Sequence, residues 1–226
     1  ELRRVTRRFT HALGANIGPE YDIPAPDVGT NAQTMVWVMD TYMNTVGHAM
    51  KNAQMRIVTG KTLTCGGSHG RDKATSQGLV HCVTEWAKEN SFDLAGKTAI
   101  IQGFGNVGSA TGKILQVHGA RLVAVADHAG AITDEDGIDA FELADWVREH
   151  GSVAGFPKAM WIDEEDFWSV PADLLVPAAL ENQITAANVG RIQARVVVEA
   201  ANGPTTLEAE KILERRGIEV LPDILV

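Results

Sequence analysis

The sequence is poor in cysteine, in basic residues relative to acidic ones, and in long apolar runs. Cys65 and Cys82 are its only cysteines and form no CxxC pair, so neither a disulfide framework nor a zinc site is indicated, and we expect no bound metal. Its 20 Lys and Arg against 29 Asp and Glu give a net charge of −9, which repels a phosphate backbone and an anionic membrane alike. No apolar run approaches the roughly 20 residues that cross a bilayer. We therefore expect a cytoplasmic protein that binds neither nucleic acid nor membrane.

The remaining composition is that of an ordinary globular protein. It is 45% hydrophobic and 22% charged, and 226 residues fit one or two domains. The chain does not begin with Met, and its apolar residues Leu2, Val5 and Phe9 already have the spacing of an amphipathic helix. At its other end the chain stops on the apolar run at 218–226. We therefore expect a piece of a longer protein.

The N-terminal third combines helices with glycine-rich loops. Residues 1–13 predict a helix, and residues 14–29, rich in Gly and Pro, predict a loop. Thr30 or Asn31 supplies the N-cap of a second helix that ends near Gly47. After a further glycine-rich stretch, Asp72 caps a helix that runs to about Asn90.

The rest of the chain alternates short, continuous apolar runs with helical segments. Strands are predicted at 97–102, 121–126, 173–176, 195–199 and 218–221, and helices at 106–118, 139–150, 186–191 and 206–216. Continuous apolar strands followed by helices predict an α/β domain with a doubly wound parallel sheet, because such strands are covered on both faces. We assign residues 51–226 to this domain and residues 1–50 to a piece of a second one.

The predicted strand at 97–102 leads directly into a glycine-rich turn. The turn reads Gly103, Phe104, Gly105, Asn106, Val107, Gly108, a GxGxxG pattern between a strand and a helix. In this context Gly103 permits the tight turn, Gly105 lets the backbone approach a pyrophosphate, and Gly108 permits close packing of helix on strand. The anion would lie on the unpaired N–H groups at the helix start. We expect a Rossmann-type dinucleotide-binding domain; the alternative is a turn whose glycines only join strand to helix.

An acidic residue ends the next predicted strand. Asp127 lies 19 residues after Gly108, where a carboxylate can accept hydrogen bonds from the adenosine ribose. An acid there would repel the 2′-phosphate of NADP, which favours NAD, although a protonated His128 would partly offset that repulsion. The alternative is that Asp127 to Gly130 form a solvated turn.

Several motifs together resemble the glutamate dehydrogenases within the Glu/Leu/Phe/Val dehydrogenase family. They are Ile23 to Thr30 (IPAPDVGT), Thr59 to Lys61, Gly66 to Arg71 (GGSHGR), Ala74 and Thr75, Gln102 to Gly108, Val176 to Ile184 (VPAALENQI) and Glu199 to Thr206 (EAANGPTT). They follow the family's order from end to end of the chain. The two prolines of PAPD match the glutamate enzymes better than their leucine and phenylalanine relatives.

The resemblance implies NAD- or NADP-dependent oxidative deamination of L-glutamate to 2-oxoglutarate and ammonia, and the reverse amination. It implies that Asp27 moves protons at the substrate amino group and the attacking water, a task that needs an acid/base near the nicotinamide. The alternative for Asp27 is a Pro-Asp-x-Gly turn ahead of the helix at Asn31. The first 50 residues would then be a remnant of the substrate domain.

Four further positions match family residues near the cofactor. Arg71 and Thr75 match residues beside it, with Thr75 next to the nicotinamide, and Ala178 and Asn202 match strand ends near nicotinamide and ribose. For Arg71 the alternative is a charged helix start. For Asn202 it is a left-handed turn residue before Gly203. Lys61 is expected to be structural.

Two elements of the family pattern have no counterpart in this sequence. One is the catalytic lysine of an upstream GGxKGG segment, and the other is a C-terminal glycine-rich segment with a serine for the substrate carboxylate. Three hypotheses therefore stay open: a glutamate dehydrogenase, a non-catalytic dinucleotide-binding fragment or module, and a sister leucine, phenylalanine or valine dehydrogenase. The resemblance also implies a homo-oligomer, a hexamer, in the full-length protein.

Overall fold

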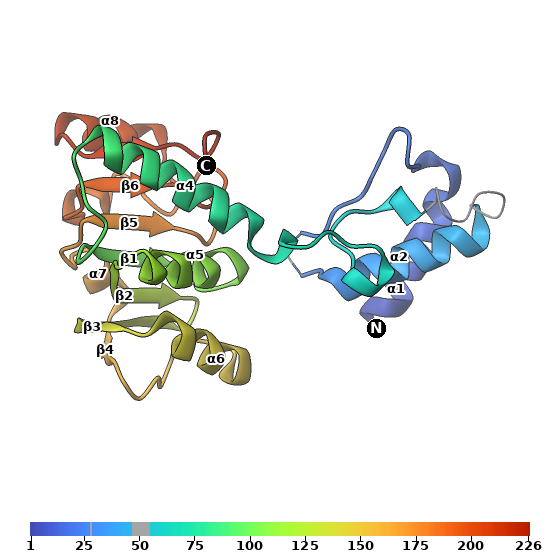
Figure 1. The fold of residues 1–226 in the computed structure, drawn as a ribbon, viewed down its shortest axis with the longest axis horizontal. Helices are drawn as coiled ribbons and strands as arrows, with labels where there is room; N and C mark the ends of the chain where they lie inside the picture. Colours follow the sequence, from blue (N-terminus) through green and yellow to red (C-terminus); the bar gives the residue numbers. More distant parts are fainter. Residues whose placement is uncertain (28, 47–54) are drawn as a thin grey trace. The chain divides into compact units, whose positions relative to one another are not determined.

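The computed structural model describes residues 1–27, 29–46 and 55–226, which form two compact units, Glu1–Asp72 and Lys73–Val226 (Figure 1). The boundary at 50–51 that the sequence suggested lies outside the described residues, and the first unit runs to Asp72. Ile57 and Val58 are buried in the core of the first unit, so the segment that contains them packs with that unit. The expected helix end at Gly47 lies outside the described residues.

The first unit is built on two helices, α1 (Leu2–Leu13) and α2 (Ala32–Thr45), which pack against each other. Asn31 is the N-cap of α2, and its side chain accepts from the backbone N–H groups of Gln33 and Thr34 in a capping box. Short 3-10 turns follow at Gly14–Asn16, Met55–Ile57, Leu63–Cys65 and Arg71–Lys73. The apolar stripe of α1, Leu2, Val5 and Phe9, is exposed in this unit.

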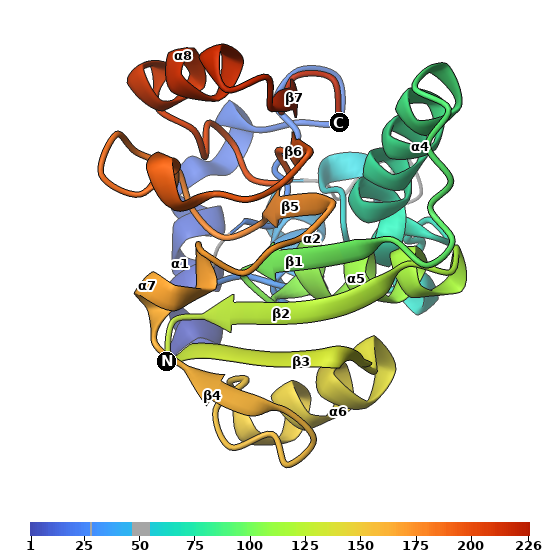
Figure 2. The ribbon, with the colours of Figure 1, turned by 90° about the vertical axis from the view of Figure 1, so that its left-hand side faces the viewer.

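The second unit contains a seven-stranded sheet in the order β4-β3-β2-β1-β5-β6-β7 (Figure 2). The strands are β1 (Thr98–Gln102), β2 (Arg121–Asp127), β3 (Gly130–Ile138), β4 (Met160–Ile162), β5 (Leu174–Pro177), β6 (Val196–Val198) and β7 (Glu219–Leu221). All neighbours are parallel except β2–β3 and β3–β4, so only β3 runs against the others. The predicted α/β class with a mainly parallel sheet is confirmed.

Alternate residues of the central strands enter two separate hydrophobic clusters. In β5, for example, Leu174 and Val176 join one cluster and Leu175 the other. The first cluster includes side chains of α4 (Ala74–Glu89) and α6 (Ala140–His150), together with α5 (Asn106–Val117). The second includes α7 (Glu164–Phe167), the 3-10 turn Val189–Arg191 and α8 (Leu207–Arg215). The sheet is therefore covered on both faces, as continuous apolar strands require.

Three details of the sequence prediction are wrong. The antiparallel strands β3 and β4 were not expected, and the helix expected at 186–191 is only a 3-10 turn. Asp72 does not cap α4: the residue at the N-cap is Lys73, with no side-chain hydrogen bond, because a 3-10 turn at Arg71–Lys73 precedes the helix.

Candidate functional site

The carboxyl ends of β1 and β5 meet where the order of the strands reverses. From β1 the chain continues to β2 on one side, whereas β5 pairs with β1 on the other side. In open α/β sheets such a reversal leaves a crevice at the carboxyl ends of the strands, which is where ligands bind. The predicted glycine turn begins at this point, directly after Gln102.

Two glycines of the turn are required by the fold itself. Gly103 has a φ of +91°, and a Cβ there would lie 2.8 Å from the Cβ of Ala179 and from the carbonyl carbon of Ala178. A Cβ on Gly108 would overlap the carbonyl oxygen of Gly103 and approach the Cγ2 of Ile101 to 3.2 Å. The tight turn at Gly103 and the close helix–strand approach at Gly108 therefore have the geometry that the sequence predicted.

Gly105 differs from both. Its φ of −78° is open to any residue, and a Cβ built on it meets no atom within 4 Å. Gly105 is also the N-cap of α5, and no side chain caps this helix. The first turn of α5 thus offers backbone N–H groups toward open space, which fits a pyrophosphate.

The loops after β5 and β6 begin at the same edge of the sheet as the glycine turn. The Ala178 N–H donates to the Gln102 carbonyl at 2.6 Å, which seats Ala178 against the glycine turn. The N–H groups of Ala200 and Ala201 donate to the Pro177 carbonyl, each at 3.0 Å. Asn202, the next residue, is exposed, and its φ is not positive, so the left-handed alternative for Asn202 is wrong.

Asp127 ends β2 as predicted, and its carboxylate is engaged by the backbone. One oxygen accepts from the Ala129 N–H and the other from the Val153 N–H, each at 2.8 Å. Gly130, the fourth residue of this turn, pairs with Asp127 across the β2–β3 hairpin. Residues 128–129 do form a turn, but Asp127 itself is half-buried and bonded to the backbone, so it is not the solvated turn residue of the alternative interpretation. A carboxylate has about four acceptor positions, so the two bonds leave room for a ribose hydroxyl.

Thr75 lies in the first turn of α4, close to the glycine turn in the same unit. The next residue, Ser76, is 1% exposed, and its hydroxyl donates to the Val107 carbonyl at 2.9 Å. This bond ties the start of α4 to the start of α5 and places exposed Thr75 beside it. Arg71 belongs to the other unit and is exposed in the 3-10 turn Arg71–Lys73.

Asp27 also belongs to the first unit, in the loop before α2. Its carbonyl accepts from the Thr30 N–H at 2.9 Å. Val28, the third residue of the Pro-Asp-x-Gly turn that was the alternative interpretation, lies outside the described residues. The Asp27 side chain is exposed in this unit. The sequence left the N-cap of α2 between Thr30 and Asn31; Asn31 is the cap, and Thr30 instead binds the backbone of Asp27.

Sequence reasoning missed a pair of hydrogen-bonded side-chain amides at the carboxyl end of β1. Gln102 is 8% exposed, and its Nε2 donates to the Oε1 of Gln183 at 2.8 Å. The Gln183 Nε2 in turn donates to the Glu181 carbonyl at 3.0 Å. This pair connects β1 with the loop that follows Ala178. Gln102 was quoted as part of the glycine motif, but no periodicity in the sequence links it to Gln183.

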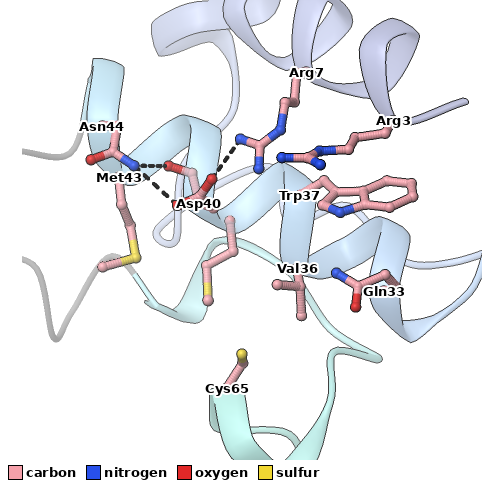
Figure 3. A pocket seen from close by; sticks show the side chains of 10 residues that line it. Arg3, Arg7, Gln33, Val36, Trp37, Asp40, Met43, Asn44 and Cys65 are labelled. Carbon is pink, nitrogen blue, oxygen red and sulfur yellow. Dashed lines mark hydrogen bonds and ion pairs between the residues drawn. The ribbon is translucent and has the colours of Figure 1, made fainter. Parts of the chain in front are cut away.

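The first unit also carries a pocket of about 720 Å³ between α1 and α2 (Figure 3). Arg3 and Arg7 reach it from α1, and Trp37 and Asp40 reach it from α2. Arg7 and Asp40 form an ion pair at 2.5 Å. None of the site residues predicted from the sequence lines this pocket.

Within residues 1–27, 29–46 and 55–226, no cluster of three or more His, Cys, Asp or Glu side chains is arranged to hold a metal ion. No helix in this part of the chain is both long and apolar enough to cross a membrane.

Comparison with known proteins identifies the family. Residues 66–226 match the family model Glutamate/Leucine/Phenylalanine/Valine dehydrogenase, and residues 1–44 match the Glu/Leu/Phe/Val dehydrogenase dimerisation domain. The chain is 47% identical over 226 residues to glutamate dehydrogenase of Thermotoga maritima, covering all of this chain and 53% of that protein. It is 42% identical over 230 residues to the cryptic catabolic NAD-specific glutamate dehydrogenase GudB of Bacillus subtilis, covering all of this chain and 52% of that protein.

Solved structures agree with these matches. The crystal structure of the hetero-hexameric glutamate dehydrogenase from Thermus thermophilus, in its Leu-bound form, superposes with a TM-score of 0.92 at 37% identity, over all of this chain and 52% of that one. The chain spans about half the length of the curated relatives it matches. The family model on 66–226 covers most of the chain, so the resemblance drawn from the motifs is confirmed: the chain belongs to the Glu/Leu/Phe/Val dehydrogenase family.

Proposed function

We propose that this chain is the cofactor-binding part, with a portion of the substrate domain, of an NAD(P)-dependent glutamate dehydrogenase. The enzyme would convert L-glutamate to 2-oxoglutarate and ammonia, and catalyse the reverse amination. The observation that carries the proposal is the glycine turn, open toward solvent at Gly105 and uncapped at the start of α5, at the point where the strand order reverses. Relatives at 42% identity that are named NAD-specific glutamate dehydrogenases support it.

In this proposal the backbone from Gly103 to Gly108, with Phe104, Asn106 and Val107 between the glycines, holds the pyrophosphate. The helix start supplies N–H donors and a partial positive charge. The Asp127 carboxylate accepts from the adenosine ribose and disfavours a 2′-phosphate, so NAD is preferred over NADP. Bound NAD(P) supplies the hydride acceptor for the amino acid.

In this proposal the nicotinamide end of the cofactor is bound by residues that follow β5 and β6 and by the first turn of α4. Ala178 is seated against Gly103 and lines the reversal point, and Asn202 is exposed just beyond β6. Thr75 lies beside the glycine turn through the neighbouring bond of Ser76 to Val107. Arg71, in the other unit, is included by its match to the family motif only.

Asp27 is the proposed catalytic acid/base. Its carboxylate would accept a proton from the substrate amino group and later accept a proton from the attacking water. The family motif supports this role, and so do the hydrogen bonds between the Asp27 backbone and Thr30, beside an exposed Asp27 side chain.

The partners in this proposal are L-glutamate, 2-oxoglutarate and ammonia, and further copies of the same chain. Assembly is supported by the match of residues 1–44 to a dimerisation domain and by the hexameric Thermus relative. A cytoplasmic location belongs to the same proposal, because both cysteines are free thiols.

A second function has one observation in its favour. The family's catalytic lysine, in a GGxKGG segment, has no counterpart in this sequence, so the chain by itself would bind a dinucleotide without turning over an amino acid.

Both functions are tested by one pair of proteins. NADH binding to the 226-residue chain is measured by fluorescence titration, and glutamate-dependent reduction of NAD and NADP is measured on a protein that continues the chain to the length of its relatives. The proposal expects binding in both proteins, turnover only in the longer one, and faster turnover with NAD. Binding without turnover of any amino acid in the longer protein supports the second function; turnover of leucine, phenylalanine or valine but not glutamate assigns a sister activity.

A further inference from the structure

The loop that carries Asp27 is contacted from both sides by Thr30 and Gly60, two residues of the motifs quoted above to which no role has been given so far. We propose that Thr30 and Gly60 are positioning residues, which fix the backbone of Asp27 so that its carboxylate meets the substrate. The inference rests on the proposed function, because it concerns the acid/base of that reaction.

Thr30 holds the loop on its C-terminal side. Its hydroxyl oxygen accepts from the Asp27 N–H at 2.7 Å and donates to the Asp27 carbonyl at 2.7 Å. The Thr30 N–H donates to the same carbonyl at 2.9 Å. Asn31, the next residue, caps α2, so these bonds are made beside a helix end. Both backbone polar groups of Asp27 therefore have Thr30 as their partner.

Gly60 holds the loop on its N-terminal side. The N–H of the preceding residue, Thr59, donates to the Pro24 carbonyl at 3.0 Å, and Gly60 itself has a φ of +62°. A Cβ built on Gly60 would lie 2.5 Å from the Cγ and 2.7 Å from the Cδ of Pro26, the residue before Asp27. The Pro26 ring thus rests directly on the backbone of Gly60, a contact that no other residue type allows.

The residues just before Gly60 are part of a buried core. Ile57 and Val58 are 0% and 2% exposed and pack in the core of the first unit with Val38 and Met39 of α2. Pro24 and Pro26 have their φ angles fixed by their rings, so the segment between the two contacts has little freedom of its own. The helix core, the Thr59–Gly60 backbone, the prolines and Thr30 together define where the Asp27 backbone lies.

Proton transfer requires the Asp27 carboxylate to be held in a fixed position. A proton-transferring carboxylate works within hydrogen-bond reach of the atom it serves, and a displacement of about 1 Å costs on the order of 100-fold in rate. A methyl group on Gly60 must push Pro26 away, because neither the proline ring nor the backbone can rotate aside. The displaced residue is the neighbour of Asp27.

The test uses the longer, assembled protein of the proposed function, with a matched glycine control. Gly60→Ala is compared with Gly14→Ala, because Gly14 also has a positive φ, +53°, but its added Cβ meets nothing within 4 Å. Pro26→Ala removes the two ring atoms that clash and leaves the Pro26 Cβ at an ordinary 3.8 Å. Thr30→Val is compared with Thr30→Ser, which keeps the hydroxyl. Each variant is assayed for kcat, for KM for glutamate, for NADH affinity and for melting temperature.

We expect Gly60→Ala to lower kcat about 100-fold while NADH affinity changes little, and Gly14→Ala to leave kcat near that of the unmodified protein. The double variant Pro26→Ala/Gly60→Ala should recover most of the loss, so that the two effects are not additive. Thr30→Val should lose about tenfold in kcat and Thr30→Ser much less.

Three results overturn the inference while the unmodified protein remains active: Gly60→Ala no slower than Gly14→Ala, a double variant whose loss is the product of the single losses, or Thr30→Val equal to Thr30→Ser. If Gly60→Ala does not fold, the Thr30 pair decides alone. An unmodified protein that binds NADH but turns over no glutamate overturns the proposed function, and this inference with it.

Discussion

Two glycines of the same turn should respond in opposite ways to alanine. Gly108 is needed by the protein's own packing, since a Cβ there would overlap the Gly103 carbonyl oxygen. Gly105 is not, since its Cβ would meet no atom within 4 Å. We therefore expect Gly108→Ala to lower stability and Gly105→Ala to lower cofactor affinity without a comparable loss of stability.

The cost at Gly108 follows from which atom is in the way. Overpacking a side chain into a core costs about 1–3 kcal/mol when neighbours can adjust. Here the neighbour is a backbone oxygen of the turn, which cannot change rotamer, so the cost lies at or above the upper end of that range. Alanine gains about 1 kcal/mol over glycine within a helix. A net loss of about 2 kcal/mol remains, equivalent to about 4–8 °C in melting temperature.

At Gly105 the stability terms nearly cancel. Alanine is a poorer N-cap than glycine, which costs about 0.5–1 kcal/mol of stability. It also lowers the conformational entropy of the unfolded chain, which stabilises the folded state by about 0.4–1 kcal/mol. The folded chain should therefore melt within a degree or two of the unmodified one. If a pyrophosphate approaches the backbone at this point, the added methyl group takes its place. We expect the dissociation constant for NADH to rise at least about tenfold, which corresponds to a loss of about 1.4 kcal/mol of binding free energy.

The assay is calorimetric melting of the 226-residue chain, with NADH fluorescence titration of the same samples. A Gly105→Ala variant that binds NADH as the unmodified chain does would refute a pyrophosphate at the start of α5. A Gly108→Ala variant that melts like the unmodified chain would show that the close helix–strand approach does not limit the fold. Measuring both variants separates loss of the fold from loss of the binding surface.

Three further predictions concern single side chains. Asn31→Ala removes the acceptor of the α2 capping box and should cost about 0.5–2 kcal/mol in urea unfolding, with Asn31→Asp close to unmodified. Asp127→Ala leaves two backbone N–H groups without their acceptor and should cost about 1–3 kcal/mol as well as weaken NADH binding, whereas Asp127→Asn keeps one acceptor oxygen and should lose less stability. Burial, and secondly the charge of Tyr21, raise the pKa of Tyr42 above its usual 10.0, so the folded state holds this proton more tightly. The resulting stability is full below pH 10 and is lost as pH rises through the raised value; Tyr42→Phe should flatten the alkaline limb of a stability–pH curve.

The strands at the centre of the sheet could be predicted from the sequence because burial on both faces leaves a plain pattern. Val196, Val197 and Val198 are all 0% exposed, and so are Leu174, Leu175 and Val176. Such runs of consecutive apolar residues occur where helices cover both sides of a parallel sheet. The predicted positions of β1, β2, β5, β6 and β7 accordingly agree with the structure to within about two residues, the usual uncertainty of element ends.

The edge strands could not be found in this way. Met160 and Trp161 of β4 are 68% and 49% exposed, and β3 turns polar after Ile132, so neither strand has a continuous apolar run. One local feature did point to β3. The turn from Asp127 to Gly130 joins two antiparallel strands, and Gly130, at a φ of +137°, leaves room for the Trp161 ring.

The helix predicted at 186–191 does not form because a side chain takes hydrogen bonds that a helix would make with the backbone. At 186–191 the Asn188 side chain accepts from the Thr185 N–H at 2.8 Å and donates to the Gln183 carbonyl at 2.8 Å. Those bonds replace the contacts that a regular helix start would make, and only a 3-10 turn remains. By contrast, Asn31, one of the two N-caps considered for α2, and Asp139, where the predicted helix 139–150 begins, each precede a long helical segment and cap it.

Asp127 marks the limit of what a sequence can say about a site. An acid at the end of a strand allowed two interpretations, a turn residue and a ribose acceptor, which the sequence presents as alternatives. In the structure the two are compatible: each carboxylate oxygen accepts one backbone N–H, from Ala129 and from Val153, and each has a further lone pair. The backbone bonds also fix the direction of the carboxylate before any ligand arrives, which lowers the entropy that a ribose contact must lose. A residue that holds the turn in place is therefore well suited to bind the cofactor, and stability and binding should both fall when Asp127 is replaced.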